Sequence, residues 1–142
     1  MKEATIRFEG ERFQAVKWAR LLRDMGFRPG GGGAREKATY ASGGNNLIAE
    51  SRGFTEREGH QSYEWRLTLK QTRRWEGTVK FYAVLLAAFA LPQTVKVTLE
   101  GRTLVAPERL KAHAEAAIVR DFGLDDLLNE GVYRPGDGIQ FT

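Results

Sequence analysis

The chain has 142 residues, no cysteine and a formal net charge of +4, and 42% of its residues are hydrophobic. This size and composition predict a single globular domain over residues 1–142, and the lack of cysteine excludes disulfides, thiol catalysis and thiolate-bound zinc. The charge is uneven, with 15 Lys and Arg against 9 Asp and Glu in residues 1–75, but 7 against 9 in residues 76–142. This asymmetry suggests an anionic partner for the first half.

Neither a signal peptide nor a membrane span is predicted. The N-terminus alternates charged and apolar residues, without the continuous apolar run of a signal peptide. The longest apolar run, residues 82–91, is about half as long as a membrane-spanning helix requires. Together with the missing cysteines, these features lead us to expect a cytoplasmic protein.

The chain begins with a predicted strand, a helix and a glycine-rich loop. Residues 3–9 alternate between apolar and polar side chains, which is typical of a half-buried strand. Residues 11–25 place apolar side chains at helical spacing, and Gly26 followed by Phe27 indicates the end of that helix. The glycines and proline of residues 28–33 predict a flexible loop.

Three further strands are predicted before the middle of the chain. Short strands are expected over residues 34–41 and 47–51, joined by a hairpin turn in residues 42–46. Residues 52–62 are polar and predict a connection without regular structure. Residues 63–70 show the strongest alternation, with an aromatic face that places this strand well inside the sheet.

The second half predicts two long helices with a hairpin between them. Residues 76–91 are almost uniformly apolar after Lys80, so we expect the most buried helix there. Strands are predicted over residues 95–99 and 102–106, and Pro107 begins a helix that ends at Gly123. A short turn or helix covers residues 125–130. These elements predict an α+β fold with a mostly antiparallel or mixed sheet and about three helices packed largely on one face.

No catalytic, cofactor-binding or metal-binding motif is recognisable. His60 and His113 belong to different predicted elements and lack the spacing of metal ligands, so we expect both to be exposed. Asp125 and Asp126 stand at a predicted helix start, where carboxylates are favoured by the helix dipole. The run Gly30–Gly33 precedes a predicted strand, whereas a phosphate-binding loop leads into a helix. We therefore predict no cofactor, no metal and no small-molecule substrate.

Basic residues form the most informative pattern. They lie on one side of the first helix, around the glycine loop and before the second helix, where Trp75 and Tyr40 are available for stacking. If they converge in space, they form a patch suited to phosphates or to an acidic protein surface; otherwise they are ordinary solvated side chains among Asp and Glu. The predicted partner-binding residues of this group are Arg12, Arg20, Arg23, Arg28, Arg35, Lys37, Arg73 and Arg74.

The C-terminal residues 131–142 are rich in glycine and predict an irregular tail. The tail carries Tyr133, Ile139 and Phe141, which are candidates for docking on a partner by strand addition. The alternative, which we favour, is that the tail folds back as a last edge strand of its own sheet.

These observations favour a non-enzymatic interaction protein that docks on a larger assembly through its basic residues. Direct nucleic-acid binding by the same residues is the alternative, although no known nucleic-acid-binding motif is present. In its size, Arg-rich composition and lack of motifs, the chain resembles the small phage-encoded proteins that bind and redirect the RNA polymerase of a thermophilic host. The resemblance implies a regulator of transcription whose partner surface lies on the polymerase or its sigma factor.

Overall fold

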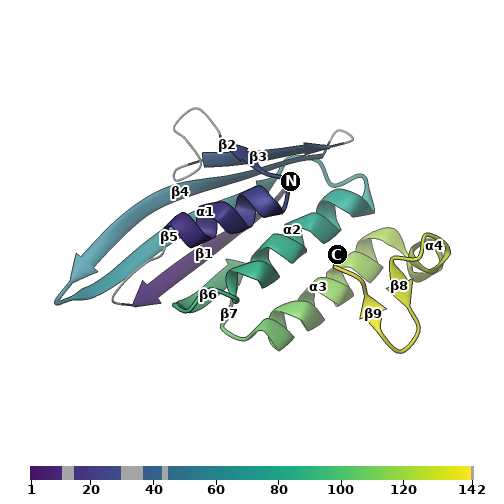
Figure 1. Ribbon diagram of the computed structural model, residues 1–142. Helices are drawn as coiled ribbons and strands as arrows, with labels where there is room; N and C mark the ends of the chain where they lie inside the picture. The colour runs from purple at the N-terminus through teal and green to yellow at the C-terminus, as the bar shows by residue number, and fades with distance from the viewer. Residues whose placement is uncertain (11–14, 30–36, 43–44, 142) are drawn as a thin grey trace.

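The structure is a computed structural model that describes residues 1–10, 15–29, 37–42 and 45–141. Its main feature is a seven-stranded antiparallel sheet in the order β2-β3-β4-β5-β1-β6-β7, covered on one face by helices (Figure 1). The strands are β1 (Lys2–Gly10), β2 (Arg28–Pro29), β3 (Lys37–Ser42), β4 (Asn45–Arg57), β5 (His60–Leu69), β6 (Thr94–Leu99) and β7 (Arg102–Leu104). The predicted α+β fold is confirmed.

Three helices lie on one face of the sheet, and a fourth short helix stands beyond α3 (Figure 1). They are α1 (Ala15–Asp24), α2 (Trp75–Ala88), α3 (Pro107–Phe122) and α4 (Leu124–Asn129). Pro107 occupies the first turn of α3, and Gly123, with a φ of 83°, follows its last residue, as the sequence predicts.

The core lies between the sheet and the helices. Alternate residues of β1 point into it, because side chains along a strand alternate between the two faces: Ile6 and Phe8 are buried, whereas Arg7 is exposed. Strand β5 occupies the centre of the sheet, which confirms its predicted interior position. Nine of the fourteen residues of α2 are buried, so it is the deeply buried helix that its composition predicts.

Helix α1 is attached to the sheet by one aromatic side chain. Trp18 is fully buried, and its ring centroid lies 5.2 Å from that of Phe8 and 6.0 Å from that of Trp65. After the helix, Gly26 adopts a φ of 97° and lets the buried Phe27 donate its backbone N–H to the carbonyl of Leu22 at 3.0 Å. The opposite side of α1 therefore faces solvent.

The prediction of an unstructured connection over residues 52–62 is wrong. Strand β4 continues to Arg57, and β5 begins at His60, so only Glu58 and Gly59 form the turn. Both turn residues have positive φ, 52° and 81°, as a tight two-residue hairpin requires. This part of the hairpin extends beyond the helices (Figure 1), and almost all of its residues are exposed, so no apolar alternation marks it as a strand.

The glycine-rich segment also differs from its prediction. Arg28 and Pro29 pair with Thr39 and Ala38 as β2 at the sheet edge, where a proline is tolerated because its missing N–H faces away from the ladder. Residues 30–36 and the hairpin residues 43–44 lie outside the described residues. The pairing of Ser42 with Asn45 confirms that β3 and β4 form a hairpin.

The C-terminal tail is more regular than predicted. It folds back, but as a separate hairpin of β8 (Tyr133–Arg134) and β9 (Gly138–Ile139), instead of adding an edge strand to the main sheet. Ile139 is buried, and its backbone N–H donates to Glu115 Oε1 on α3 at 3.3 Å. The apolar residues of the tail thus complete the protein's own core.

We expect Gly138→Ala to loosen this hairpin. Gly138 has a φ of 77°, and a Cβ at this position would lie 2.5 Å from Glu115 Oε1. The variant should therefore lower the free energy of unfolding by about 1–3 kcal/mol, which urea titration would measure. Gly136→Ala is the matched control, because its φ is 86° but a Cβ would meet nothing within 4 Å. Equal losses in both variants would contradict a role for the contact with Glu115.

Candidate functional site

The face of the sheet without helices is polar, and several of its charges form ion pairs. Each pair joins neighbouring strands, where opposite charges stabilise the sheet. The pairs are Arg7 with Glu64 at 3.4 Å, Arg66 with Glu3 at 3.4 Å and with Glu50 at 3.2 Å, and Lys96 with Glu9 at 3.2 Å. The positive charges of these three side chains are therefore largely neutralised by neighbouring carboxylates.

The helical face carries a second set of basic side chains, and most of these form no ion pair with the residues that the structure describes. We call Lys17, Arg20, Arg23, Arg73 and Arg74 the basic surface; all five are exposed. Arg23 lies 3.9 Å from Asp24, but both side chains are about 70% exposed, so this contact is weak. The other four have no ion pair with any described residue.

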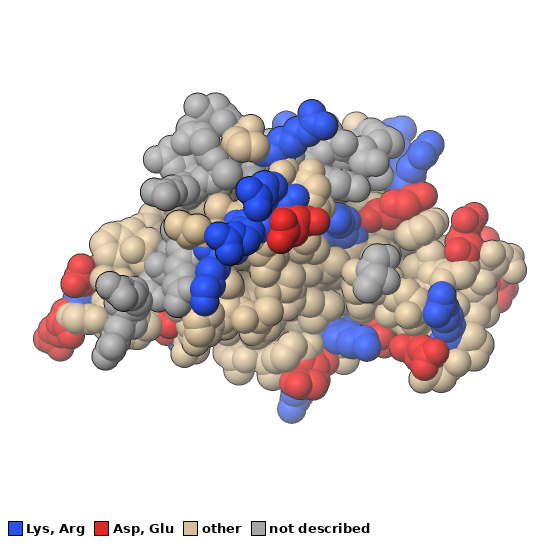
Figure 2. All heavy atoms as spheres, in the orientation of Figure 1, with Lys and Arg blue, Asp and Glu red and all other residues tan. Residues whose placement is uncertain are grey.

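The topology brings these residues to one end of the helical layer. Strand β1 and α1 run in opposite directions, and so do β5 and α2. Because β1 and β5 are antiparallel, the end of α1 at Arg23 and the start of α2 at Arg74 lie toward the same sheet end (Figure 1). Figure 2 shows Lys and Arg side chains in a band over α1.

Not all predicted members of this patch can be placed. Arg12 and Arg35 lie outside the described residues, and Lys37 is described only as the first residue of β3. Arg28 is exposed but does not join the other cations, because its register with Thr39 in β3 places it on the face of the sheet without helices. Of the two predicted stacking residues, Trp75 is half-buried against the core, and the side chain of Tyr40 is not among those described.

The three tail residues do not join the basic surface. Ile139 is 2% exposed, and Tyr133 and Phe141 are half-buried against the same core. Their apolar groups are already packed within the chain, so a partner could reach Ile139 only if the tail unfolded.

The histidines and carboxylates singled out in the sequence also have defined places. His60 is exposed as predicted, but His113 is not: its side chain is 13% exposed, and Nε2 lies 3.3 Å from Glu100 Oε2. Asp125 and Asp126 occupy the first turn of α4, as predicted, without a side-chain capping hydrogen bond. Within the described ranges, no group of His, Asp and Glu is arranged to hold a metal ion.

One cluster of ionisable residues was missed by sequence reasoning. Glu100, in the β6–β7 turn, lies 3.9 Å from Lys2, 3.3 Å from His113 and 3.9 Å from Arg120. Lys2 also lies 3.4 Å from Asp121, which accepts a hydrogen bond from Arg120 at 3.1 Å. These residues come from three elements and share no local pattern; only the Glu100-Gly101 turn was predictable.

The cluster surrounds the buried hydroxyl of Tyr82. Burial, with the charges of Glu100 and Asp121, raises the pKa of this phenol far above neutral, so it stays protonated and is unsuited to act as a base. Each carboxylate of the cluster already has a cationic neighbour. This arrangement fits an ion-pair network that joins β1, the β6–β7 turn and α3.

The network predicts a dependence of stability on pH. Partial burial acts to raise the pKa of Asp121, but Arg120 and Lys2 outweigh it, so this pKa lies below its usual value. The ionised carboxylate therefore stabilises the fold above its unfolded pKa, near 4, and this contribution disappears as the pH falls through the folded pKa. We expect Asp121→Asn to lower the midpoint of thermal unfolding at pH 7 but not at pH 2.5. The control is Asp125→Asn, which removes an exposed carboxylate that has no ion pair within the described part of the chain.

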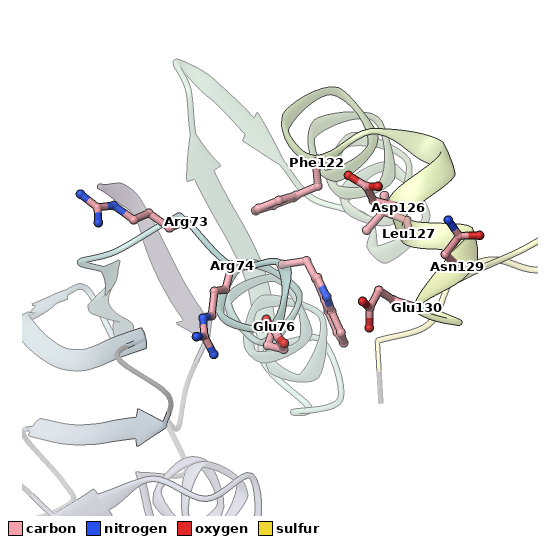
Figure 3. A pocket seen from close by; sticks show the side chains of 9 residues that line it. Arg73, Arg74, Glu76, Phe122, Asp126, Leu127, Asn129 and Glu130 are labelled. Carbon is pink, nitrogen blue, oxygen red and sulfur yellow. The ribbon is translucent and has the colours of Figure 1, made fainter.

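A cavity of about 410 Å³ opens beside the start of α2 (Figure 3). Its walls come from the first residues of α2, the end of α3 and the side of α4. The lining residues are Arg73, Arg74, Trp75, Glu76, Phe122, Asp126, Leu127, Asn129 and Glu130. Arg73 and Arg74 belong to both the cavity rim and the basic surface, so the two features are continuous.

Comparisons with protein-family models, with curated proteins and with solved structures give no significant match. Among the described helices, none has the length and apolar character that a membrane crossing requires.

Proposed function

We propose that the protein is a non-enzymatic docking protein that binds an acidic surface of a larger protein assembly through the basic surface. The observation that supports this is the contrast between the two faces of the molecule. On the open sheet face, Arg7, Arg66 and Lys96 are paired with carboxylates, whereas four of the five side chains of the basic surface are exposed and have no ion pair with a described residue. Unpaired exposed charge raises the association rate with a partner of opposite sign.

A protein partner is favoured over nucleic acid by the aromatic residues near this surface. Proteins that bind single strands without sequence preference combine basic grooves with exposed aromatic rings on which bases stack. Near the basic surface, Trp18 is fully buried, and Trp75 is half-buried against the core. Among the described side chains, the basic surface therefore provides charge without an exposed stacking ring.

The transcription machinery is the assembly that we propose as the partner, in keeping with the resemblance to phage-encoded polymerase-binding proteins. RNA polymerase or its sigma factor would supply the acidic surface, and the protein would act as a cytoplasmic regulator.

The test is binding at two salt concentrations. The full chain is immobilised and exposed separately to RNA polymerase from a thermophilic bacterium, to its free sigma factor, and to generic duplex and single-stranded DNA. We expect polymerase or sigma-factor binding that survives moderate salt. Phosphate contacts would instead give DNA binding that falls linearly with salt on a log–log plot. DNA binding of that kind, without polymerase or sigma-factor binding, would overturn the proposal in favour of a nucleic-acid binder.

A further inference from the structure

The cavity beside α2 has a different character from the basic surface that it adjoins. Glu130 projects from α4 toward the start of α2 and Asp126 projects toward Phe122, whereas Arg73 and Arg74 extend away from α4 (Figure 3). Phe122 contributes an aromatic wall, and Trp75 contributes a second. The interior therefore presents carboxylates and aromatic rings, while the arginines stand at its outer rim.

The carboxylates of this cavity are available for a ligand. Glu76, Asp126 and Glu130 form no ion pair with any residue that the structure describes. Among the described residues, these carboxylates belong to no group that could hold a metal ion. The cavity of about 410 Å³ is also far larger than an ion needs. Its dimensions suit an organic cation with a long side chain.

An arginine side chain matches this combination of groups. A guanidinium is planar and stacks on aromatic faces. It has five N–H donors, and two of them can bind the two oxygens of one carboxylate at the same time. An aliphatic stem leading to the guanidinium would pack against Leu127 and the two rings.

We infer that the cavity receives an arginine side chain of the partner protein, next to the acidic partner surface that meets Arg73 and Arg74. This inference rests on the proposed function. It extends that function, because it places one arginine side chain within the acidic surface of the partner. Nucleic acids carry no such cation. The cavity is thus a determinant of specificity for protein over nucleic acid.

The experiment titrates the full chain with N-acetyl-arginine amide and follows tryptophan fluorescence. Trp18 and Trp65 are 0% and 2% exposed in the core, so a change reports on Trp75 in the cavity wall. We expect saturable binding in the millimolar range, and no saturation with N-acetyl-glutamine amide, which has no charge. The double variant Asp126→Asn, Glu130→Gln should raise the half-saturating concentration about tenfold or more.

The matched control is Asp125→Asn with Asp137→Asn, which also removes two exposed carboxylates but none from the cavity. An equal weakening in both double variants, or an equal response to both amides, would overturn the inference. Its failure is distinguishable from that of the proposed function. If arginine amide does not bind while the basic surface is needed for partner binding, only the cavity inference falls. If arginine amide binds but charge reversal on α1 leaves partner binding unchanged, the proposed function falls instead.

Discussion

The double variant Arg20→Glu, Arg23→Glu is expected to weaken partner binding by about tenfold to a hundredfold, chiefly through slower association. Both side chains are exposed on α1, and Arg20 has no ion pair among the described residues. Reversing them places two negative charges in the centre of the basic surface. The association rate with RNA polymerase or its sigma factor, measured at low and moderate salt, would show the effect. The difference in rate between the variant and the unchanged protein should become smaller as salt screens the charges.

Folding should be unaffected, because neither residue contributes to the buried side of α1. The matched control is Arg109→Glu with Lys111→Glu on α3, which changes the net charge equally at exposed positions outside the basic surface. Equal weakening by both double variants would show that only total charge matters. If the Arg20→Glu, Arg23→Glu variant bound the partner as well as the unchanged protein, the basic surface would have no role in binding.

The largest expected effect on stability comes from Trp18→Ala. Trp18 is fully buried between α1 and the sheet, and its ring contacts those of Phe8 and Trp65. Removing it should lower the free energy of unfolding by about 3–5 kcal/mol, since both apolar burial and aromatic contacts are lost and a cavity remains. A small domain has only about 5–15 kcal/mol in total, so the variant should be close to unfolding.

Urea titration followed by circular dichroism measures this loss. Val16→Ala, on the same helix, serves as the control, because Val16 is 51% exposed and its truncation should change stability by less than about 0.5 kcal/mol. If Trp18→Ala were as mild as Val16→Ala, α1 would not be held on the sheet by this side chain. The basic surface would then lack the rigid support that the structure assigns to it.

The fold was largely predictable where one face of an element is buried. Strand β5 shows this, because Trp65, Leu67 and Leu69 alternate with polar residues that face solvent. The outer half of the β4–β5 hairpin was missed because its residues are exposed on both faces, so burial imposes no pattern there. The C-terminal hairpin was missed for another reason: its two strands have two residues each, too few for alternation to appear.

The candidate site was predictable only in part. The positive charge of α1 and of Arg73-Arg74 is visible in the sequence, but whether each cation has a partner depends on strand pairing. Arg66, for instance, meets Glu3 and Glu50 only because β1 and β4 flank β5. The cavity was not predictable, because Trp75 and Glu130 are far apart in the chain and line it together only when α3, which contacts both α2 and α4, brings α4 near the start of α2. In the sequence, the acidic residues in the first turn of α4 are explained by the helix dipole, so they give no indication of a cavity.

The position of β1 also has a consequence for how the chain reaches its fold. Both neighbours of this strand, β5 and β6, come much later in the sequence, so β1 cannot begin to pair during synthesis until Gln61, its first partner in β5, has left the ribosome. The β4–β5 hairpin needs the same strand, but it closes through its own two-residue turn, so it can form first. Closing the loop between β1 and its partners carries the main entropic cost, which predicts folding in milliseconds to seconds, slower than a helical protein of this size. Until then, the first strand of the protein stays exposed and available for incorrect pairing.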